Sequence, residues 1–230
     1  MNNSKALIPI SVDSKRFSTN EVIFALNSIS TKHKKIVFLI ADGLQLYNKA
    51  TQVEGGKKIK NIIETFNLRN NYHNERVKWL LQIKSKLFPT ISEMSWDFKD
   101  MYSISDSEFH KIYRNVVVSY LTIKDFSEDI KLTAVAHCLK VSKNYSELDL
   151  NLSIEYILEE IAANLRIRVL GKITTEYYLG ELPLPLINLY QNKYEVDVFT
   201  LCGKEINHHA KFEFYHSPDQ AFINWVSATD

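Results

Sequence analysis

Two sets of polar residues, far apart in the chain, have types and positions that are common in catalytic sites. Ser11 ends a short apolar run, residues 6–10, and the C-terminal end of a strand is a common site for chemistry in α/β proteins. A serine hydroxyl attacks only when a base or a preorganised polar environment activates it. Tyr177 and Glu181 are four residues apart, so on a helix they share one face. A carboxylate there can bind a cation through charge-assisted hydrogen bonds and can act as a general base.

The pair Tyr177 and Glu181 is predicted to lie at the end of a helix. Pro183 follows closely, and the residue before a proline avoids the helical conformation. A rival pair, Tyr156 and Glu160, has the same spacing, but it lies in the middle of a predicted helix and no proline follows it. We therefore favour the first pair, and the rival stays open.

The elements that must position these residues begin with a strand-helix-strand unit. Residues 5–11 are predicted to form a strand. Ser18-x-x-Glu21 is a capping box, after which apolar residues follow at helical spacing. Residues 36–41 form a continuous apolar run, which is typical of a buried parallel strand. This unit predicts a parallel sheet with a right-handed crossover.

The middle of the chain is predicted to be mostly helical and the C-terminal part to be rich in strands. We expect helices over about 56–66, 73–87, 105–123, 127–142 and 153–165, with Ser105 and Ser153 as caps. We expect strands over 91–98, 194–201 and 211–215, a loop over 143–151 and a turn at Gly203. The fold class is therefore a three-layer α/β fold with a mainly parallel central sheet, in one domain spanning 1–230.

Composition sets broad limits on function. The chain has 230 residues, of which 45% are hydrophobic and 24% charged, with a net charge of +1. Any nucleic-acid surface must therefore be local. No apolar run approaches the ~18 residues of a membrane span, and no signal-peptide core is present, so we expect a cytoplasmic protein. Cys138 and Cys202 are predicted to be buried free thiols.

Metal and nucleotide sites are not expected from the motifs. Cys202, His208, His209 and His216 lack the ligand spacing of a zinc site. Gly55-Gly56 follows no strand, so it does not form a phosphate-binding loop.

Four short segments, in this order, resemble the cyclodipeptide synthases, a family that takes two aminoacyl-tRNAs and makes a cyclic dipeptide. The segments are Lys5–Ser11 with Arg16-Phe17-Ser18, Ile36–Asp42, Tyr177–Leu184 and Phe214–Pro218. The resemblance implies a Rossmann-like fold, similar to the catalytic domains of class I tyrosyl- and tryptophanyl-tRNA synthetases. It also implies a ping-pong route through aminoacyl and dipeptidyl esters on Ser11, with no cofactor.

The resemblance assigns roles to individual residues, and it implies that Tyr177 and Glu181 hold the aminoacyl amine. The implied catalytic residues are Ser11, Tyr177, Glu181 and Tyr215, and the implied substrate-binding residues are Leu7, Pro9, Ser14, Leu39 and His216. Three features depart from the family pattern. Ser14 stands where many members have asparagine, and Pro9 replaces a small residue. The stretch Tyr194–His209 looks like an inserted hairpin ahead of Tyr215.

Two aminoacyl-tRNAs are the expected partners, and a monomer is the expected state. Six basic residues form the predicted tRNA-binding surface: Lys57, Lys58, Lys60, Arg69, Arg76 and Lys78. A solvated helix face is the alternative interpretation of this run. Two alternatives also remain for the whole protein. One is a different serine acyltransferase or hydrolase, with His216 as its base, and the other is a non-catalytic tRNA-binding module.

Overall fold

A six-stranded sheet forms the centre of the molecule, with strand order β3-β2-β1-β4-β5-β6. The computed structural model describes residues 5–11, 18–30, 33–44, 47, 57–85, 87, 94–141, 144–170, 173, 175–177, 183–203, 212–215 and 223–225. The strands are β1 (Lys5–Ile10), β2 (Lys35–Ile40), β3 (Ser95–Asp100), β4 (Thr175–Tyr177), β5 (Phe212–Tyr215) and β6 (Ile223–Trp225). All neighbouring pairs are parallel except β5 and β6, so the predicted mainly parallel sheet is confirmed.

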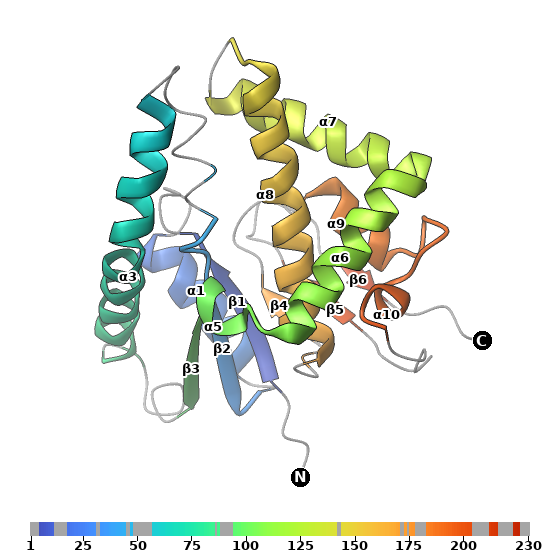
Figure 1. Cartoon of the computed structure of the whole chain (residues 1–230). Coiled ribbons are helices and arrows are strands. Elements are labelled where there is room, and N and C mark those ends of the chain that lie inside the picture. Colours follow the sequence, from blue (N-terminus) through green and yellow to red (C-terminus); the bar gives the residue numbers. More distant parts are fainter. Residues whose placement is uncertain are drawn as a thin grey trace, which may run out of the picture.

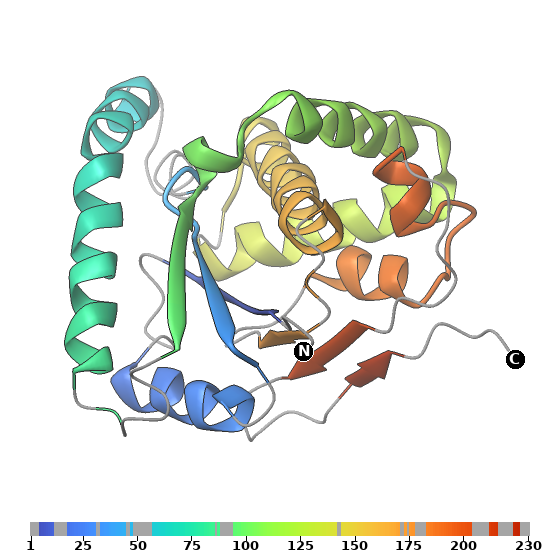
Figure 2. The same cartoon turned by 90° about the horizontal axis from the view of Figure 1, so that it is seen from below.

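Helices lie on both sides of this sheet (Figures 1 and 2). One side carries α1 (Thr19–Ser30) and α3 (Lys57–Lys84). The other side carries α5 (Met101–Ile104), α6 (Ser107–Thr122), α7 (Lys124–Val141), α8 (Glu147–Leu165) with the π-helical turn η1 (Arg166–Leu170), α9 (Leu184–Tyr190) and α10 (Val198–Leu201). The predicted three-layer α/β arrangement is therefore confirmed.

The inner strands bury both of their faces. Leu7 of β1 packs into the core shared with α8, whereas its neighbour Ile8 packs into the core shared with α1 and α3. In β2, Leu39 and Phe38 divide between the two cores in the same way. Successive side chains of a strand point to opposite faces, so two apolar layers require an unbroken apolar run. This explains why both strands could be recognised from sequence.

Pro9 can occupy an inner strand because its nitrogen, which carries no N–H, faces β4 and not β2. The Ile10 carbonyl accepts the Ala41 N–H at 2.9 Å, so Ile10 faces β2. Backbone groups alternate along a strand, so the Pro9 nitrogen faces β4. There the pairing covers Ala6 and Leu7. Within the described sheet, the proline therefore interrupts no ladder hydrogen bond.

Several predicted helix boundaries are wrong, although the helices exist. The two helices expected over 56–66 and 73–87 are one continuous helix, α3. The N-cap of α6 is Asp106 rather than Ser105, because the Asp106 carboxylate accepts the Phe109 N–H at 2.9 Å.

The start of α8 also differs from expectation. Ser146 and Asp149 form a reciprocal capping box, so the helix begins at Glu147, inside the stretch expected to be a loop. Ser153 is not a cap, since it lies fully buried inside α8. The helix expected over 153–165 lies within α8, and its apolar positions are all buried: Ile154, Ile157, Leu158, Ile161 and Leu165.

The strand and inserted hairpin expected from residue 194 onward are wrong for the described residues 194–203. Asp197 caps the short helix α10 by accepting the Thr200 N–H at 2.7 Å. A local side-chain hydrogen bond of this kind competes with extended structure. The strand expected over 211–215 is confirmed as β5.

Candidate active site

Ser11 lies at the edge of the sheet where the parallel strands end. It is half-buried and directly follows β1, and Asp42 lies two residues after the end of the neighbouring β2. Tyr177 ends β4 and stands opposite Tyr215, which ends β5. Because these strands are parallel, all four positions share the C-terminal edge, the usual ligand-binding side of such sheets. The structure therefore brings three of the four predicted catalytic positions, Ser11, Tyr177 and Tyr215, to one edge.

The helix predicted through Tyr177 and Glu181 is wrong at its first residue. Tyr177 is in β4, which pairs with β1 and β5, and Glu181 lies outside the described residues. Pro183 does not end a helix but is the N-cap of α9. A proline is well suited to the start of a helix, where its missing N–H is not needed. The shared-face argument therefore fails for this pair.

The rival pair lies in the middle of a regular helix. Tyr156 and Glu160 are both in α8, one turn apart on one face. Glu160 is only 7% exposed, and Tyr156 is half-buried. A carboxylate this deeply buried needs a specific partner or function, since burying a charge is costly unless another group compensates it.

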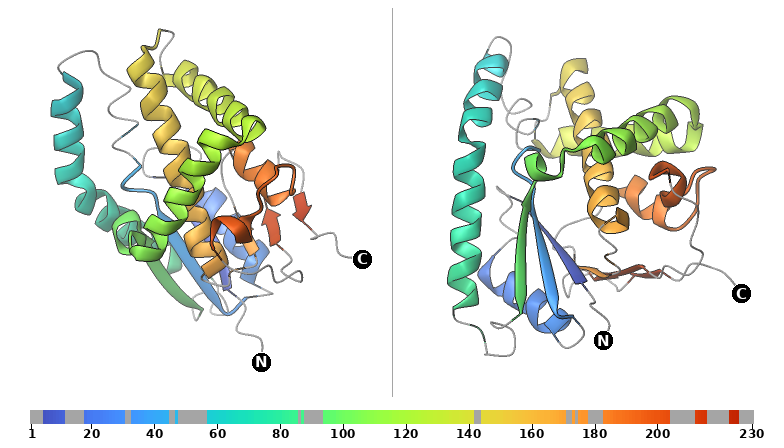
Figure 3. Two further views of the ribbon diagram at one scale, coloured as in Figure 1. Left: turned by 45° about the vertical axis from the view of Figure 1, so that its right-hand side comes forward. Right: turned by 60° about the horizontal axis from the view of Figure 1, so that its bottom comes forward.

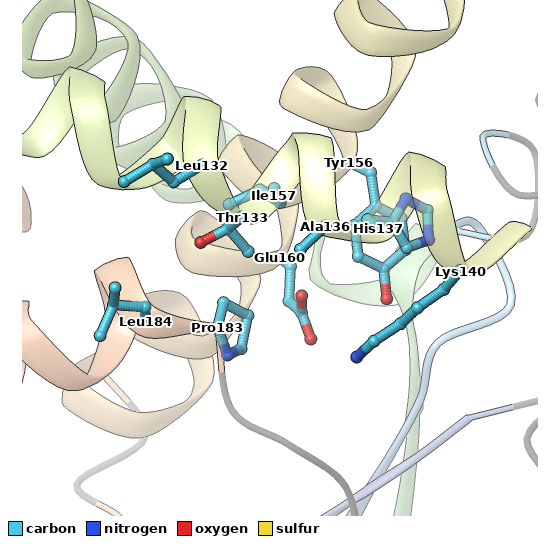
Figure 4. A pocket seen from close by; sticks show the side chains of 10 residues that line it. All are labelled: Leu132, Thr133, Ala136, His137, Lys140, Tyr156, Ile157, Glu160, Pro183 and Leu184. Carbon is cyan, nitrogen blue, oxygen red and sulfur yellow. The ribbon is translucent and has the colours of Figure 1, made fainter. Parts of the chain in front are cut away.

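A cavity of about 380 Å³ opens beside this pair (Figure 4). Its walls come from α7, α8 and the start of α9, and the lining residues are Leu132, Thr133, Ala136, His137, Lys140, Tyr156, Ile157, Glu160, Pro183 and Leu184. The Glu160 carboxylate and the Lys140 amino group point toward the same side, below α7 (Figure 4). An apolar pocket with a few convergent polar groups is typical of a small-molecule site.

Aromatic contacts hold the Tyr156 ring in place. His137 stacks on it with ring centroids 5.2 Å apart and ring planes 13° apart. The Nδ1 atom of His137 lies 3.0 Å from the hydroxyl of the buried Ser153. On another side, Tyr47 meets the Tyr156 ring edge-on at 6.3 Å. Tyr47 follows the end of β2, so this contact ties the Tyr156 face of α8 to the sheet edge that carries Ser11.

The protonation states of Tyr156 and His137 follow from their surroundings. Burial, and then the neighbouring Glu160 carboxylate, raise the pKa of the Tyr156 phenol well above its usual value. The phenol therefore stays protonated and can donate a hydrogen bond. Burial, helped by Lys140, lowers the pKa of His137, so its imidazole is neutral at pH 7.

A second set of carboxylates lies on the adjacent face of α8. The Tyr113 hydroxyl donates to Glu155 at 2.5 Å. Tyr47 shares a hydrogen bond with Glu159, and burial raises the pKa of the Glu159 carboxyl. These tyrosines therefore anchor α8 to α6 and to the segment after β2.

The predicted substrate-binding residues fall into two groups. Leu7, Pro9 and Leu39 are buried, and Leu7 and Leu39 pack in the core between the sheet and α8. Ser14 and His216 lie outside the described residues.

All six predicted tRNA-binding residues are on α3, but they do not share one face. Position 69 is about three turns after 58, and 76 is about two turns after 69, so these three positions form one row along the helix. Positions 60 and 78 are about five turns apart and form a row on the opposite side. The first row continues into the buried Leu80 and Ile83. The N-terminal half of α3 extends past the C-terminal edge of the sheet (Figures 1 and 3). Its first row therefore faces the end of the molecule that carries Ser11.

Individual basic side chains on α3 differ in their surroundings. Lys60 is exposed and pairs with Glu64 at 3.6 Å, while Arg76 lies over the Trp79 ring at 5.1 Å. Lys78 is exposed. Side chains of Lys57, Lys58 and Arg69 are not among those described.

Sequence analysis missed His137 and Lys140, which complete the cavity. Their spacing of three, on the apolar helix before α8, was the available signal. Cys138 and Cys202 are both buried thiols, as predicted. Three of the four residues weighed as zinc ligands, His208, His209 and His216, lie outside the described residues. No helix in the described part of the chain is long and apolar enough to cross a membrane.

Comparison with known proteins identifies the fold. No family model matches the chain, and no curated protein sequence matches it. Solved structures do match. A cyclodipeptide synthase from Fluoribacter dumoffii has a TM-score of 0.65 and 14% identity, over 82% of this chain and 81% of that one. One from Candidatus Glomeribacter gigasporarum, bound to Phe-tRNAPhe, has a TM-score of 0.59 and 14% identity, over 82% of each chain.

A third match bears on the wider fold class. It is a Mycobacterium tuberculosis protein described as demonstrating that cyclodipeptide synthetases are related to type I tRNA synthetases. Its TM-score is 0.62 with 13% identity, over 82% of this chain and 78% of that one. The chain therefore has the fold of the cyclodipeptide synthases, and the expected Rossmann-like architecture is confirmed.

Proposed function

We propose that this protein is a tRNA-dependent cyclodipeptide synthase that joins two aminoacyl groups into a 2,5-diketopiperazine. The observation that carries the proposal is the cavity beside Tyr156 and Glu160, in a fold shared with cyclodipeptide synthases and tied through Tyr47 to the sheet edge of Ser11. The structural match that binds Phe-tRNAPhe supports aminoacyl-tRNA as the substrate class. With aminoacyl-tRNAs as substrates, the cytoplasm is the proposed location of the reaction.

Ser11 is the proposed nucleophile of the first step. Its hydroxyl oxygen attacks the ester carbonyl of one aminoacyl-tRNA. The bond to the terminal ribose breaks, and the ribose oxygen takes up the proton that the serine loses. The products are an aminoacyl ester on Ser11 and free tRNA. One ester replaces another, so the step needs no ATP.

Two further acyl transfers complete the ring. The amine of the Ser11-bound aminoacyl group attacks the ester of the second aminoacyl-tRNA, and the second tRNA leaves. The dipeptide remains on Ser11 as an ester. Its terminal amine then attacks that ester, which closes the six-membered ring and regenerates the serine hydroxyl.

Glu160 and Tyr156 replace Glu181 and Tyr177 as the proposed amine-binding pair. An amine must lose a proton before it attacks, and a buried carboxylate can bind the ammonium and accept that proton. In this proposal the Tyr156 phenol, which stays protonated, is available beside the carboxylate as a hydrogen-bond donor. Lys140, on the wall formed by α7, adds a positive charge to the cavity.

Tyr177 and Tyr215 stay in the proposed site as strand-end residues with a role in proton transfer during ring closure. Adjacent strands are about 4.8 Å apart. β4 neighbours β1, whereas β5 is one strand further away. The end of β4 is therefore closer to Ser11 than the end of β5.

Expression in a bacterial host, followed by mass spectrometry of the medium for diketopiperazines, tests the proposal. Wild-type protein should release at least one cyclic dipeptide, and Ser11→Ala should release none. Purified wild-type protein incubated with radiolabelled aminoacyl-tRNA should retain acid-stable label that Ser11→Ala lacks. Label without a cyclic product would favour another serine acyltransferase. tRNA binding without label or product would favour a tRNA-binding module.

A further inference from the structure

Three metal-ligating side chains meet at the sheet edge, on the side of α3. Asp42 follows β2, Asp100 ends β3, and His73 lies in α3. One potential ligand atom from each lies within 4.8 Å of the other two. These residues come from three elements separated in sequence, so helical or strand spacing does not bring them together. We propose that Asp42, His73 and Asp100 bind a divalent transition-metal ion that fastens α3 to the sheet edge.

His73 has a buried ring nitrogen suited to metal binding. Its Nδ1 atom is shielded from solvent, and no group of the described residues forms a hydrogen bond with it. It lies 3.7 Å from Asp100 Oδ2, beyond hydrogen-bonding distance. A buried ring nitrogen normally has a partner, and a metal ion between it and the carboxylate would supply one.

The two carboxylates are already oriented by the backbone. Asp42 is 2% exposed, and its Oδ1 accepts the Met101 N–H at 3.0 Å. Gly43 permits this approach, because a Cβ there would lie 2.9 Å from the Met101 side chain. Asp100 Oδ1 accepts the Ser103 N–H at 2.5 Å, which leaves Oδ2 facing His73. Such hydrogen bonds to the ligands are typical of protein metal sites.

Charge favours a cation at this position. The Asp42 carboxylate is buried and lies in the same cluster as the Asp100 carboxylate. Two carboxylates so close together repel each other, and a bound cation removes that repulsion.

The donor set indicates which kind of metal ion would bind. One imidazole and two carboxylates suit Zn²⁺, Mn²⁺ or Co²⁺ better than Ca²⁺ or Mg²⁺, which prefer oxygen ligands only. Two atoms bound to one ion at about 2.0–2.2 Å stand no more than about 4.4 Å apart. His73 and Asp100 have side chains 21% and 23% exposed, so a small rotation of either can complete the set.

The site goes beyond the proposed acyl-transfer chemistry and can be tested without it. Full-length protein is stripped with EDTA, dialysed and titrated with Zn²⁺ by calorimetry. Wild-type protein should bind one equivalent with a rise in Tm. His73→Gln and Asp100→Asn should each weaken the affinity by about ten-fold or more. Asp97→Asn is the matched control, since Asp97 lies on the same strand but pairs with Lys35 at 3.1 Å and Lys99 at 3.7 Å.

Two further measurements locate the ion. Co²⁺ bound at this site should give visible d–d bands without the strong thiolate absorption that Cys138 or Cys202 would produce. Zn²⁺ should also slow backbone hydrogen exchange in α3 around His73. If wild-type protein neither binds Zn²⁺ nor gains stability, the inference is wrong. It is equally wrong if both variants bind Zn²⁺ as tightly as wild type, or if the Co²⁺ spectrum shows thiolate ligands.

Discussion

Glu160 has the surroundings of an amine-binding carboxylate. It is nearly buried, it lines the cavity with Lys140, and its helical neighbour Tyr156 is held by His137 and Tyr47. Rigid aromatic contacts of this kind keep a reacting group in place without a conformational cost at each turnover. His137 and Tyr47 therefore serve to position Tyr156.

Glu160→Gln should reduce cyclodipeptide formation by ~10²-fold or more, because the amide keeps the shape but cannot accept a proton. Product yield by mass spectrometry measures the effect, and circular dichroism checks the fold. Glu181→Gln is the matched comparison and should retain most activity. The opposite result, with Glu181→Gln inactive and Glu160→Gln active, would restore the pair chosen from sequence.

His137 should make stability fall on acidification. Its pKa is lowered in the folded state, so between pH 7 and 5 the unfolded chain binds the proton first, near the ordinary pKa of about 6.5. The folded protein is therefore most stable above that pH and loses stability below it. Urea unfolding at pH 7 and pH 5 should show a smaller loss for His137→Phe, which keeps the stacking on Tyr156. His110→Gln, at an exposed site, should behave as wild type. An equal loss in His137→Phe would show that other groups cause the acid sensitivity.

At the scale of elements, α3 has two distinct parts. Its C-terminal half packs on the sheet through Leu80 and Ile83, while its N-terminal half extends beyond the strand ends (Figure 3). The row of positions 58, 69 and 76 continues the packed side, so it faces the Ser11 end of the molecule. The row of 60 and 78 faces away.

Reversing charge on the first row should therefore weaken tRNA binding more than reversing it on the second. Lys58→Glu with Arg69→Glu should lower the slope of log affinity against log salt by about one unit for each tRNA phosphate that the variant no longer neutralises. Lys60→Glu with Lys78→Glu is the control, with the same change in charge on the opposite side. Filter binding at several salt concentrations gives both slopes. Equal effects of the two pairs would mean that binding follows net charge and not the face of the helix.

At the scale of the whole molecule, the sheet separates two apolar cores. Phe38 of β2 is fully buried in the α1–α3 core, with its ring centroid 4.8 Å from Trp96 and 5.5 Å from Phe98. Both contacts cross to β3, so this core joins the two strands that carry Asp42 and Asp100. Loss of packing here would therefore disturb the sheet edge as well as stability.

Phe38→Ala should lower the free energy of unfolding by about 3–5 kcal/mol, because it removes a buried ring and leaves a cavity. Leu121→Ala, at a side chain that is 73% exposed, should change it by less than about 0.5 kcal/mol. Urea denaturation followed by circular dichroism measures both. A loss for Phe38→Ala no larger than that for Leu121→Ala would contradict the two-core description.

Local pattern was enough to identify the strands β1 and β2, the helix over 153–165 and the strand-end position of Ser11. An unbroken apolar run and a 3.6-residue period are properties of the sequence alone, and burial on both faces of a sheet or one face of a helix requires them. The α8 boundary was mistaken because Ser146 and Asp149 form a capping box within residues expected to be a loop.

Tertiary structure was needed to show which of the two Tyr-x-x-x-Glu pairs lies on one helix. Both pairs satisfy the same helical spacing, and the proline after Glu181 suggested a helix through Tyr177, which instead lies in β4. Residues 175–177 are a strand because β1 and β5 pair with them on either side, an interaction between segments far apart in the chain. The cavity beside Glu160 and the meeting of Asp42, His73 and Asp100 have the same origin. Periodicity reports which face of an element is buried, whereas only the packing of elements determines which faces meet.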